Sequence, residues 1–333
     1  MIAALLVFGY SVLVAWWLPV VLTPLTRNGA GARLGIAAWI TAMASVLSSA
    51  AVAAAFLIRS AINGWSGLAE AVCRSVAGGA CTPVIYRSAL YELGLGIAAI
   101  IVTLTAIVLI WRYGRRIQQA QRQTRAHAEA ARITGRRLTS DSSGMVVLEA
   151  PQLAAYCVPG RPSTIVVTSG ALSVLEPAQL TAVLAHERAH LAGRHHVLVA
   201  LTRGLAAIFP AVPLFTRGQS EIARLAEMRA DDAAAQRAGR RPLIEALLAM
   251  GTGSAVRQGV PGNPGGPGGH LSSDKQMPAA ALAAAGYAVV ARVQRLMDPP
   301  TRARQARFTL ALSGLLTVLP AVSGLIFVLA SGS

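Results

Sequence analysis

Four long apolar segments constrain the fold of this chain more than any other feature of its sequence. A helix crosses the hydrocarbon core of a bilayer with about 20 predominantly apolar residues, and it satisfies its own backbone polar groups there. Apolar runs of this kind cover residues 2–23, 35–58, 93–111 and 308–330. We therefore predict a multi-pass membrane protein, mainly α, with four transmembrane helices.

The composition agrees with a membrane location and argues against a nucleic-acid partner. Of the 333 residues, 54% are hydrophobic and only 13% are charged, whereas soluble domains carry about 25% charged residues. The net charge of +16 raises nucleic acid as a partner. However, aromatic residues make up only 5% of the chain, and the arginines cluster beside the apolar runs. We expect contact with the lipid bilayer and no direct binding of nucleic acid.

Basic residues beside the apolar runs predict the topology, because cytosolic loops carry an excess of Arg and Lys. The arginines gather in the first loop, after the third run and before the fourth: Arg27, Arg33, Arg112, Arg115, Arg116, Arg122, Arg125, Arg302, Arg304 and Arg307. We expect a cell-membrane protein with its N-terminus outside. The prediction divides the chain into a three-helix membrane region (1–111, with an outside loop at about 59–92), a cytosolic domain (112–307), and a fourth helix with a short tail (308–333).

Three cysteines are present. Cys73 and Cys81 share the predicted outside loop, where they either form a disulfide or remain two free thiols. Cys157 falls in the cytosolic domain, and we expect it to be a small buried residue rather than a reactive thiol.

The cytosolic domain has the pattern of an α+β fold. Short strand-like runs at 145–148 and 164–168 precede a helical pattern through Leu191, in which Leu180, Val183 and Leu184 form an apolar stripe. Ser173 and Glu176 give a weak helix-start signal. Helices are also expected at about 220–237 and 280–297, and the Gly- and Pro-rich loop at about 256–278 is expected to be disordered.

The sequence His186-Glu187-Arg188-Ala189-His190 is the strongest chemical signal. It places two imidazoles one helical turn apart on the same face, where both can bind one zinc ion. Glu187 can then act as general base, taking a proton as water attacks a peptide carbonyl. The alternative is an exposed polar helix turn without any metal.

A catalytic zinc site needs a third protein ligand, and the sequence offers two candidates. Glu227 is the preferred one, with Asp231 one turn later to orient a ligand histidine. The alternative for this pair is a solvated acidic helix face. His196 is the second candidate, because His186 to His196 satisfies the metzincin spacing with Gly193 at the turn. His195 and His196 are otherwise expected to be polar residues at the membrane surface.

The apolar run at 197–215 limits this choice. A single membrane crossing there would put Glu227 on the opposite side from His186 and His190. If Glu227 is the ligand, the run must be re-entrant, interfacial or buried in protein.

The quoted motifs, together with Ala155-Tyr-Cys-Val-Pro-Gly160 and Ile165-Val-Val-Thr-Ser-Gly-Ala-Leu172, resemble the membrane-bound gluzincins. These comprise the BlaR/MecR-type zinc metallopeptidases and the related HtpX/Ste-type peptidases. Three spans before the zinc domain and one after it fit the BlaR/MecR arrangement better. The resemblance implies His186, His190 and Glu227 as ligands of one zinc and Glu187 as the catalytic residue.

The resemblance also implies that the strand at 165–168 holds substrate by edge pairing. The C-terminal penicillin-binding sensor of BlaR/MecR proteins is expected to be missing here. We therefore expect a zinc endopeptidase that cleaves a protein or peptide at the cytosolic face in regulated proteolysis, for example of a cytosolic transcriptional repressor. The alternatives are an HtpX-like quality-control protease of membrane proteins and a catalytically silent membrane receptor or scaffold.

Overall fold

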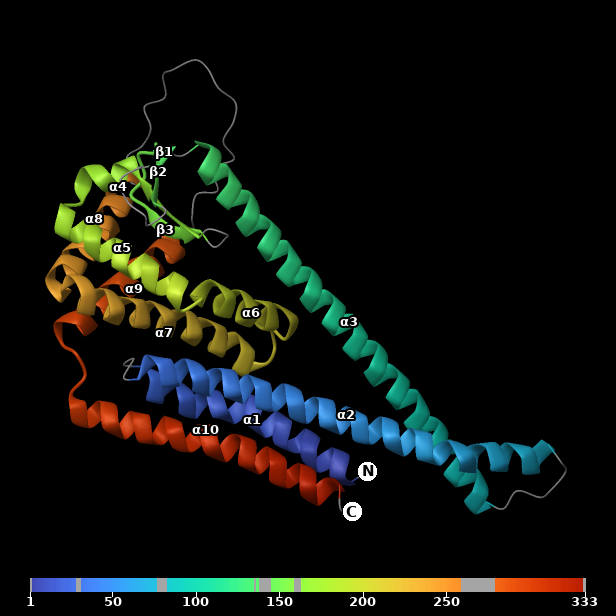
Figure 1. The fold of residues 1–333 in the computed structure, drawn as a ribbon. Helices are drawn as coiled ribbons and strands as arrows, with labels where there is room; N and C mark the ends of the chain where they lie inside the picture. The colour runs from blue at the N-terminus through green and yellow to red at the C-terminus, as the bar shows by residue number, and fades with distance from the viewer. Residues whose placement is uncertain are drawn as a thin grey trace. The chain divides into compact units, whose positions relative to one another are not determined.

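The computed structural model describes residues 2–27, 31–76, 83–134, 136–137, 145–158, 163–258 and 279–331. It is mostly helical with one small sheet (Figure 1). The chain divides into two compact units, which are described separately: the first comprises Met1–Gln119, Val199–Ile222 and Ala306–Ser333, and the second Ala120–Leu198 and Ala223–Gln305.

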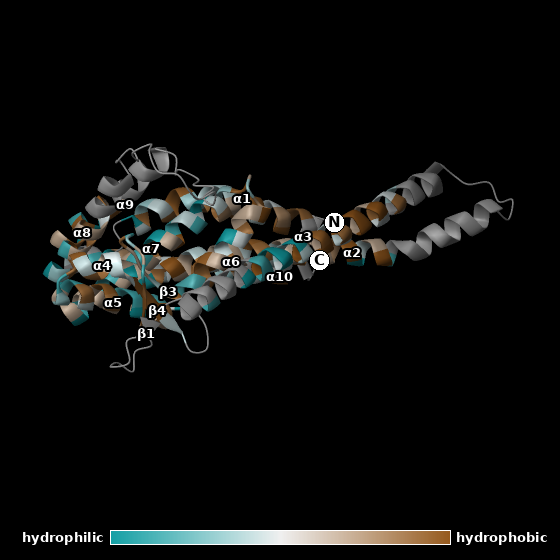
Figure 2. Cartoon of the chain, turned by 90° about the horizontal axis from the view of Figure 1, so that it is seen from above, coloured by the Kyte–Doolittle hydropathy of each residue, from teal (hydrophilic) through white to brown (hydrophobic). Residues whose placement is uncertain are grey.

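Four apolar helices lie wholly or mostly in the first unit: α1 (Ile2–Thr26), α2 (Ala32–Val76), α3 (Pro83–Thr134) up to Gln119, and α10 (Arg302–Ser331) from Ala306. Within the described residues, each of these four holds a stretch long and apolar enough to cross a membrane, at Leu5–Thr26, Ala32–Asn63, Leu93–Gln119 and Gln305–Val322. Figure 2 shows long hydrophobic stretches on α2 and α3. The prediction of four spanning helices is confirmed at the level of length and composition, while their orientation in the membrane stays a prediction.

The outer surfaces of these helices suit contact with lipid. Trp16, Trp17 and Ile110 are large apolar side chains, and each is more than half exposed. Polar contacts lie inside the unit instead: the Tyr10 hydroxyl is 3.2 Å from Ser45 Oγ and donates to the Leu319 carbonyl at 3.3 Å. An interior hydrogen bond of this kind satisfies polar groups that lipid cannot.

The run at 197–215 forms a helix and a turn rather than a continuous span. Helix α6 (His195–Ile208) has 14 residues, which is about 21 Å of helix against a hydrocarbon thickness of about 30 Å. After a turn, α7 (Pro213–Ala238) follows. Gly204 in α6 lies so close to Tyr113 that an added Cβ would be 2.8 Å from the ring, which keeps this helix packed on α3 within the first unit. The segment is therefore too short to make a single crossing.

The second unit contains a four-stranded sheet of β1 (Arg136–Arg137), β2 (Met145–Leu148), β3 (Ala155–Val158) and β4 (Thr164–Thr168). The strand order is β1-β2-β4-β3, with β4 parallel to β2 and antiparallel to β3. All five residues of β4 are buried. The expected edge pairing at 165–168 is therefore wrong, because β4 has a neighbour on each side; β1 and β3 are the edge strands of the described sheet.

The second unit also contains α4 (Ser169–Val174), α5 (Pro177–Ala192), α8 (Arg240–Gln258) and α9 (Ala279–Met297), together with α7 from Ala223 onward. Glu176 caps α5 in a capping box with Gln179, so the helix starts at Pro177, four residues after Ser173. In Figure 1, α5 lies between the sheet and α7.

Two apolar clusters hold α5 in this place. The first joins it to β4, α4 and α8 through Ile165, Val167, Ala171, Val183 and Ala246, with Leu180 and Leu184 packed against them. The second joins it to α7, α8 and α9 through Ala182, Ala185, Ala234, Leu243 and Leu296. The apolar stripe expected at Leu180, Val183 and Leu184 is confirmed. Because this stripe packs into the core, it sets the rotation of α5 about its axis and therefore the direction in which the two histidines point.

Some expectations fall on residues that the structure does not describe. These are the loop at 259–278, Cys81 and the side chain of Cys73. The part of the expected loop at 256–258 is helical and ends α8.

Candidate metal centre

Two histidines of α5 point their ring nitrogens at a common point. His186 and His190 are four residues apart, and this spacing places them on the same helix face. His186 Nε2 and His190 Nε2 are 3.0 Å apart, and the two rings meet edge to face. His186 is buried, with 8% of its surface exposed. The motif is therefore turned inward and is not an exposed polar turn.

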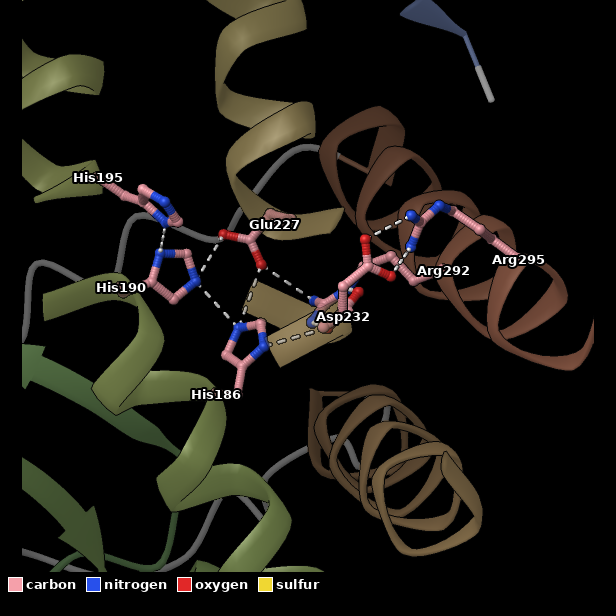
Figure 3. Close-up of polar contacts among 8 residues, drawn as sticks. His186, His190, His195, Glu227, Asp232, Arg292 and Arg295 are labelled. Atoms are coloured by element: carbon pink, nitrogen blue, oxygen red, sulfur yellow. Dashed lines mark hydrogen bonds and ion pairs between the residues drawn. The ribbon is translucent and has the colours of Figure 1, made fainter. Parts of the chain in front are cut away.

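A carboxylate from α7 completes the group. Glu227 Oε2 lies 3.5 Å from His186 Nε2, and Glu227 Oε1 lies 3.4 Å from His190 Nε2. One ligand atom of each residue lies within 4.8 Å of the others (Figure 3). Two imidazole nitrogens and one carboxylate oxygen form a donor set that suits a catalytic zinc ion with one position left open. The residues present therefore fit a metal ion.

Asp231 lies behind the first histidine. It follows Glu227 by one turn of α7, and its Oδ1 is 3.0 Å from His186 Nδ1. Only 1% of its surface is exposed. A carboxylate in contact with Nδ1 holds the proton on that nitrogen, so that Nε2 can present its lone pair to a metal.

The charges of the group depend strongly on one another. Burial disfavours the charged form of His186, but hydrogen bonds with Asp231 and Glu227 outweigh burial and raise the pKa of His186 to about 9. Burial likewise opposes the anion of Glu227, yet hydrogen bonds with His186 and His190 and the charge of Arg292 bring its pKa far below its usual range. In the metal-free protein, His186 therefore carries a proton that a metal must displace.

Glu187 has the environment of a proton carrier. Burial raises the pKa of its carboxyl, while His186, His190 and a hydrogen bond with the backbone of Cys157 act in the opposite direction. A carboxyl with a raised pKa is a stronger base than an exposed one. Burial and the neighbouring Glu187 also raise the pKa of the Cys157 thiol to about 12. Cys157 is therefore protonated at neutral pH, as expected of an unreactive thiol.

His195 contacts the ligand candidate His190, although it is expected from the sequence to be a polar residue at the membrane surface. It is only 3% exposed, and its Nδ1 lies 3.0 Å from His190 Nδ1. Burial lowers its pKa to about 4, so the ring is neutral. Gly193 ends α5, and Arg194 then takes a positive φ of 49°, which turns the chain so that His195 returns to His190. A Cβ at position 193 would clash with the His195 ring, at 2.6 Å from its Cδ2 and closer still to its Nε2, so only glycine fits there without a shift of the ring.

His196, the alternative third ligand, is not part of the metal-ligand group found among the described residues. The metzincin spacing selects His196, whereas in the structure it is the preceding residue, His195, that contacts His190.

Two arginines of α9 also contact the acidic side chains of α7. Arg292 donates to Asp231 through two nitrogens, at 2.8 and 2.6 Å, and a third nitrogen lies 3.2 Å from Glu227 Oε2. Arg295 makes a two-point contact with Asp232 at 2.8 and 2.7 Å. An amphipathic pattern predicts the helix but not these contacts, because the partners are 61 and 63 residues apart in the sequence.

Comparison with known proteins gives one match. Residues 116–209 match the model of peptidase family M48, over a segment that contains His186, Glu187, His190 and His195 and ends before Glu227. No curated protein and no solved structure matches the chain. The match does not choose between a BlaR/MecR-type and an HtpX/Ste-type peptidase. Together with the four apolar helices and a histidine–glutamate group compatible with a metal ion, it supports a membrane-associated metallopeptidase.

Proposed function

We propose that this chain is a membrane-embedded zinc endopeptidase that hydrolyses peptide bonds at the cytosolic face. His186, His190 and Glu227 hold one zinc ion, Glu187 is the general base and Asp231 orients His186. The observation that carries the proposal is the meeting of three ligand atoms within 4.8 Å from two different helices. A chance acidic face on α7 would have no reason to meet the histidine pair of α5.

The chemistry divides between the ion and the protein. A zinc ion bound by these residues supplies a Lewis acid that polarises the carbonyl of the substrate. Glu187 takes a proton from the attacking water while the oxygen of that water bonds to the carbonyl carbon. The C–N bond then breaks as the proton passes to the leaving nitrogen. The raised pKa of Glu187 suits both transfers, because it makes the carboxylate a better base and its acid form stable enough to deliver the proton.

The edge strand β3 is the proposed position for the substrate backbone. It pairs with β4 on one side only within the described sheet, and its Tyr156 side chain is 39% exposed. The backbone of Cys157 hydrogen-bonds to Glu187, so the strand adjoins the general base. An extended peptide added to this edge would run past Glu187.

The proposed role is regulated proteolysis, with a cytosolic transcriptional repressor as the model substrate. The basic residues around the apolar helices support a cytosolic position for the second unit. Quality control of membrane proteins is the alternative role. Capture of substrates on a Glu187→Gln variant separates the two: soluble proteins on the variant support the first role, and membrane proteins alone support the second.

The activity is tested with the full chain in lipid nanodiscs and an unfolded protein substrate. We expect one zinc per chain in both the natural protein and Glu187→Gln. Loss of the general base should slow cleavage about 100-fold or more. Glu245→Gln is the control, because Glu245 is a partly exposed residue of α8 that contacts Arg241 and Gln179 and is not a member of the metal-ligand group. A natural protein without bound zinc, or a Glu187→Gln variant with full activity, would refute the proposal and favour a silent scaffold.

A further inference from the structure

One guanidinium group contacts both acidic side chains of the candidate metal centre. Arg292 Nε and Nη2 donate to the two oxygens of Asp231. Arg292 Nη1 lies 3.2 Å from Glu227 Oε2 (Figure 3). The Arg292 side chain is largely buried, at 18% exposure. All three nitrogens therefore have carboxylate partners.

We propose that Arg292 is a positioning residue of the metal centre, which sets the orientation of Glu227 directly and that of His186 through Asp231. The inference rests on the proposed function, since it assigns a role in holding the zinc. The planar fork of arginine can contact two carboxylates in fixed directions, and a lysine cannot. Three of the five N–H donors of Arg292 face Asp231 and Glu227, and these described contacts assign it a positioning role.

The surrounding charges explain why a cation is needed at this point. Glu187, Glu227 and Asp231 are three acidic groups on two neighbouring helices, and Asp231 is almost completely buried. A buried carboxylate without a partner is costly, and two close carboxylates repel each other. Arg292 offsets the negative charges of Asp231 and Glu227 and contacts both side chains at once. Asp231 can then accept a hydrogen bond from the Nδ1–H of His186, while Glu227 keeps an oxygen for the metal.

A purely structural role is the alternative, in which Arg292 only docks α9 on α7. The chain contains a matched control for this role. Three residues later, Arg295 makes the same kind of two-point contact with Asp232, the neighbour of Asp231. The Asp232 side chain is 45% exposed, and Asp232 is not a member of the metal-ligand group. Both arginines join the same two helices, but only Arg292 touches Glu227 and Asp231 among the pairs described.

The experiment measures zinc affinity by competition with a chelator in the full-length protein, for Arg292→Gln, Arg292→Lys and Arg295→Gln. Changes behind a metal ligand weaken binding by about 10- to 100-fold. We expect a loss of this size for Arg292→Gln and a smaller loss for Arg292→Lys, which keeps the charge but cannot bridge both carboxylates. Arg295→Gln should bind zinc within about twofold of the natural protein, since its partner touches no ligand.

Melting of the zinc-free proteins separates docking from positioning. Both glutamine variants should melt earlier than the natural protein, because each removes one contact between α7 and α9. The inference is wrong if Arg292→Gln keeps its zinc affinity, or if Arg295→Gln loses as much. If Arg292→Gln does not fold, Arg292→Lys decides alone, and full affinity in it overturns the inference. A natural protein that binds no zinc would overturn the proposed function as well, whereas zinc binding unaffected by Arg292 overturns this inference only.

Discussion

Replacing His195 by phenylalanine should weaken zinc binding without opening a cavity. A ligand histidine that offers Nε2 to a metal carries its proton on Nδ1. In His190 that Nδ1 lies 3.0 Å from Nδ1 of the neutral His195, which is the acceptor. Phenylalanine keeps a ring of similar size in this buried place but removes the acceptor.

The expected loss of zinc affinity follows from the Nδ1–H group of His190, which is left without an acceptor. A buried donor that loses its acceptor costs about 1–3 kcal/mol. The cost falls on the zinc-bound form, in which His190 must carry its proton on Nδ1. At about 1.4 kcal/mol per tenfold change, the zinc affinity should drop by about 5- to 150-fold.

The assay is titration of the apo protein with zinc against a chelator of known affinity. His196→Phe is the control, since His196 is the next residue on α6 and lies outside the metal-ligand group. We expect its affinity to stay within about threefold of the natural protein. Unchanged affinity in His195→Phe, or a larger loss in His196→Phe, would refute the hydrogen-bond argument.

Two further predictions concern protonation and packing. Zinc binding at pH 7 should release about one proton from His186, because a group with a raised pKa holds its proton until the metal displaces it. The apparent zinc affinity should therefore fall about tenfold for each pH unit below about 9. Calorimetry in buffers of different ionisation enthalpy measures the proton release, and a pH-independent zinc affinity would contradict the prediction. Gly170→Ala should lower the free energy of unfolding by about 1–3 kcal/mol. The new methyl group would lie 2.7 Å from the backbone carbon of Pro151 and 2.8 Å from the Gln152 backbone oxygen. Denaturant unfolding measures the loss, and a variant of full stability would show that the loop at Pro151 and Gln152 can move aside.

Local patterns in the sequence were enough to predict the first half of the metal centre. The spacing of His186 and His190 puts them on one helix face in any α-helix, and the stripe of Leu180, Val183 and Leu184 tells which face packs inward. Glu227 was the preferred third ligand because a carboxylate followed by Asp231 one turn later repeats the pattern of a ligand and its support. The role of each of these residues remains a prediction.

The rest depends on contacts between distant segments, which periodicity does not encode. The resemblance implies edge pairing at 165–168, but pairing with both β2 and β3 puts this strand inside the sheet. His195 is buried because Gly193 and Arg194 turn the chain back, and the same letters would also fit a surface turn. Arg292 reaches Asp231 only because α9 docks on α7, and such docking has no local signal.

Metal analysis of the purified natural protein beside Glu227→Ala and His196→Ala tests the central claim most directly. The account predicts one zinc per chain in the natural protein and in His196→Ala, and little or none in Glu227→Ala after dialysis. A natural protein without zinc would contradict it, and so would a Glu227→Ala variant that keeps its zinc while His196→Ala loses it.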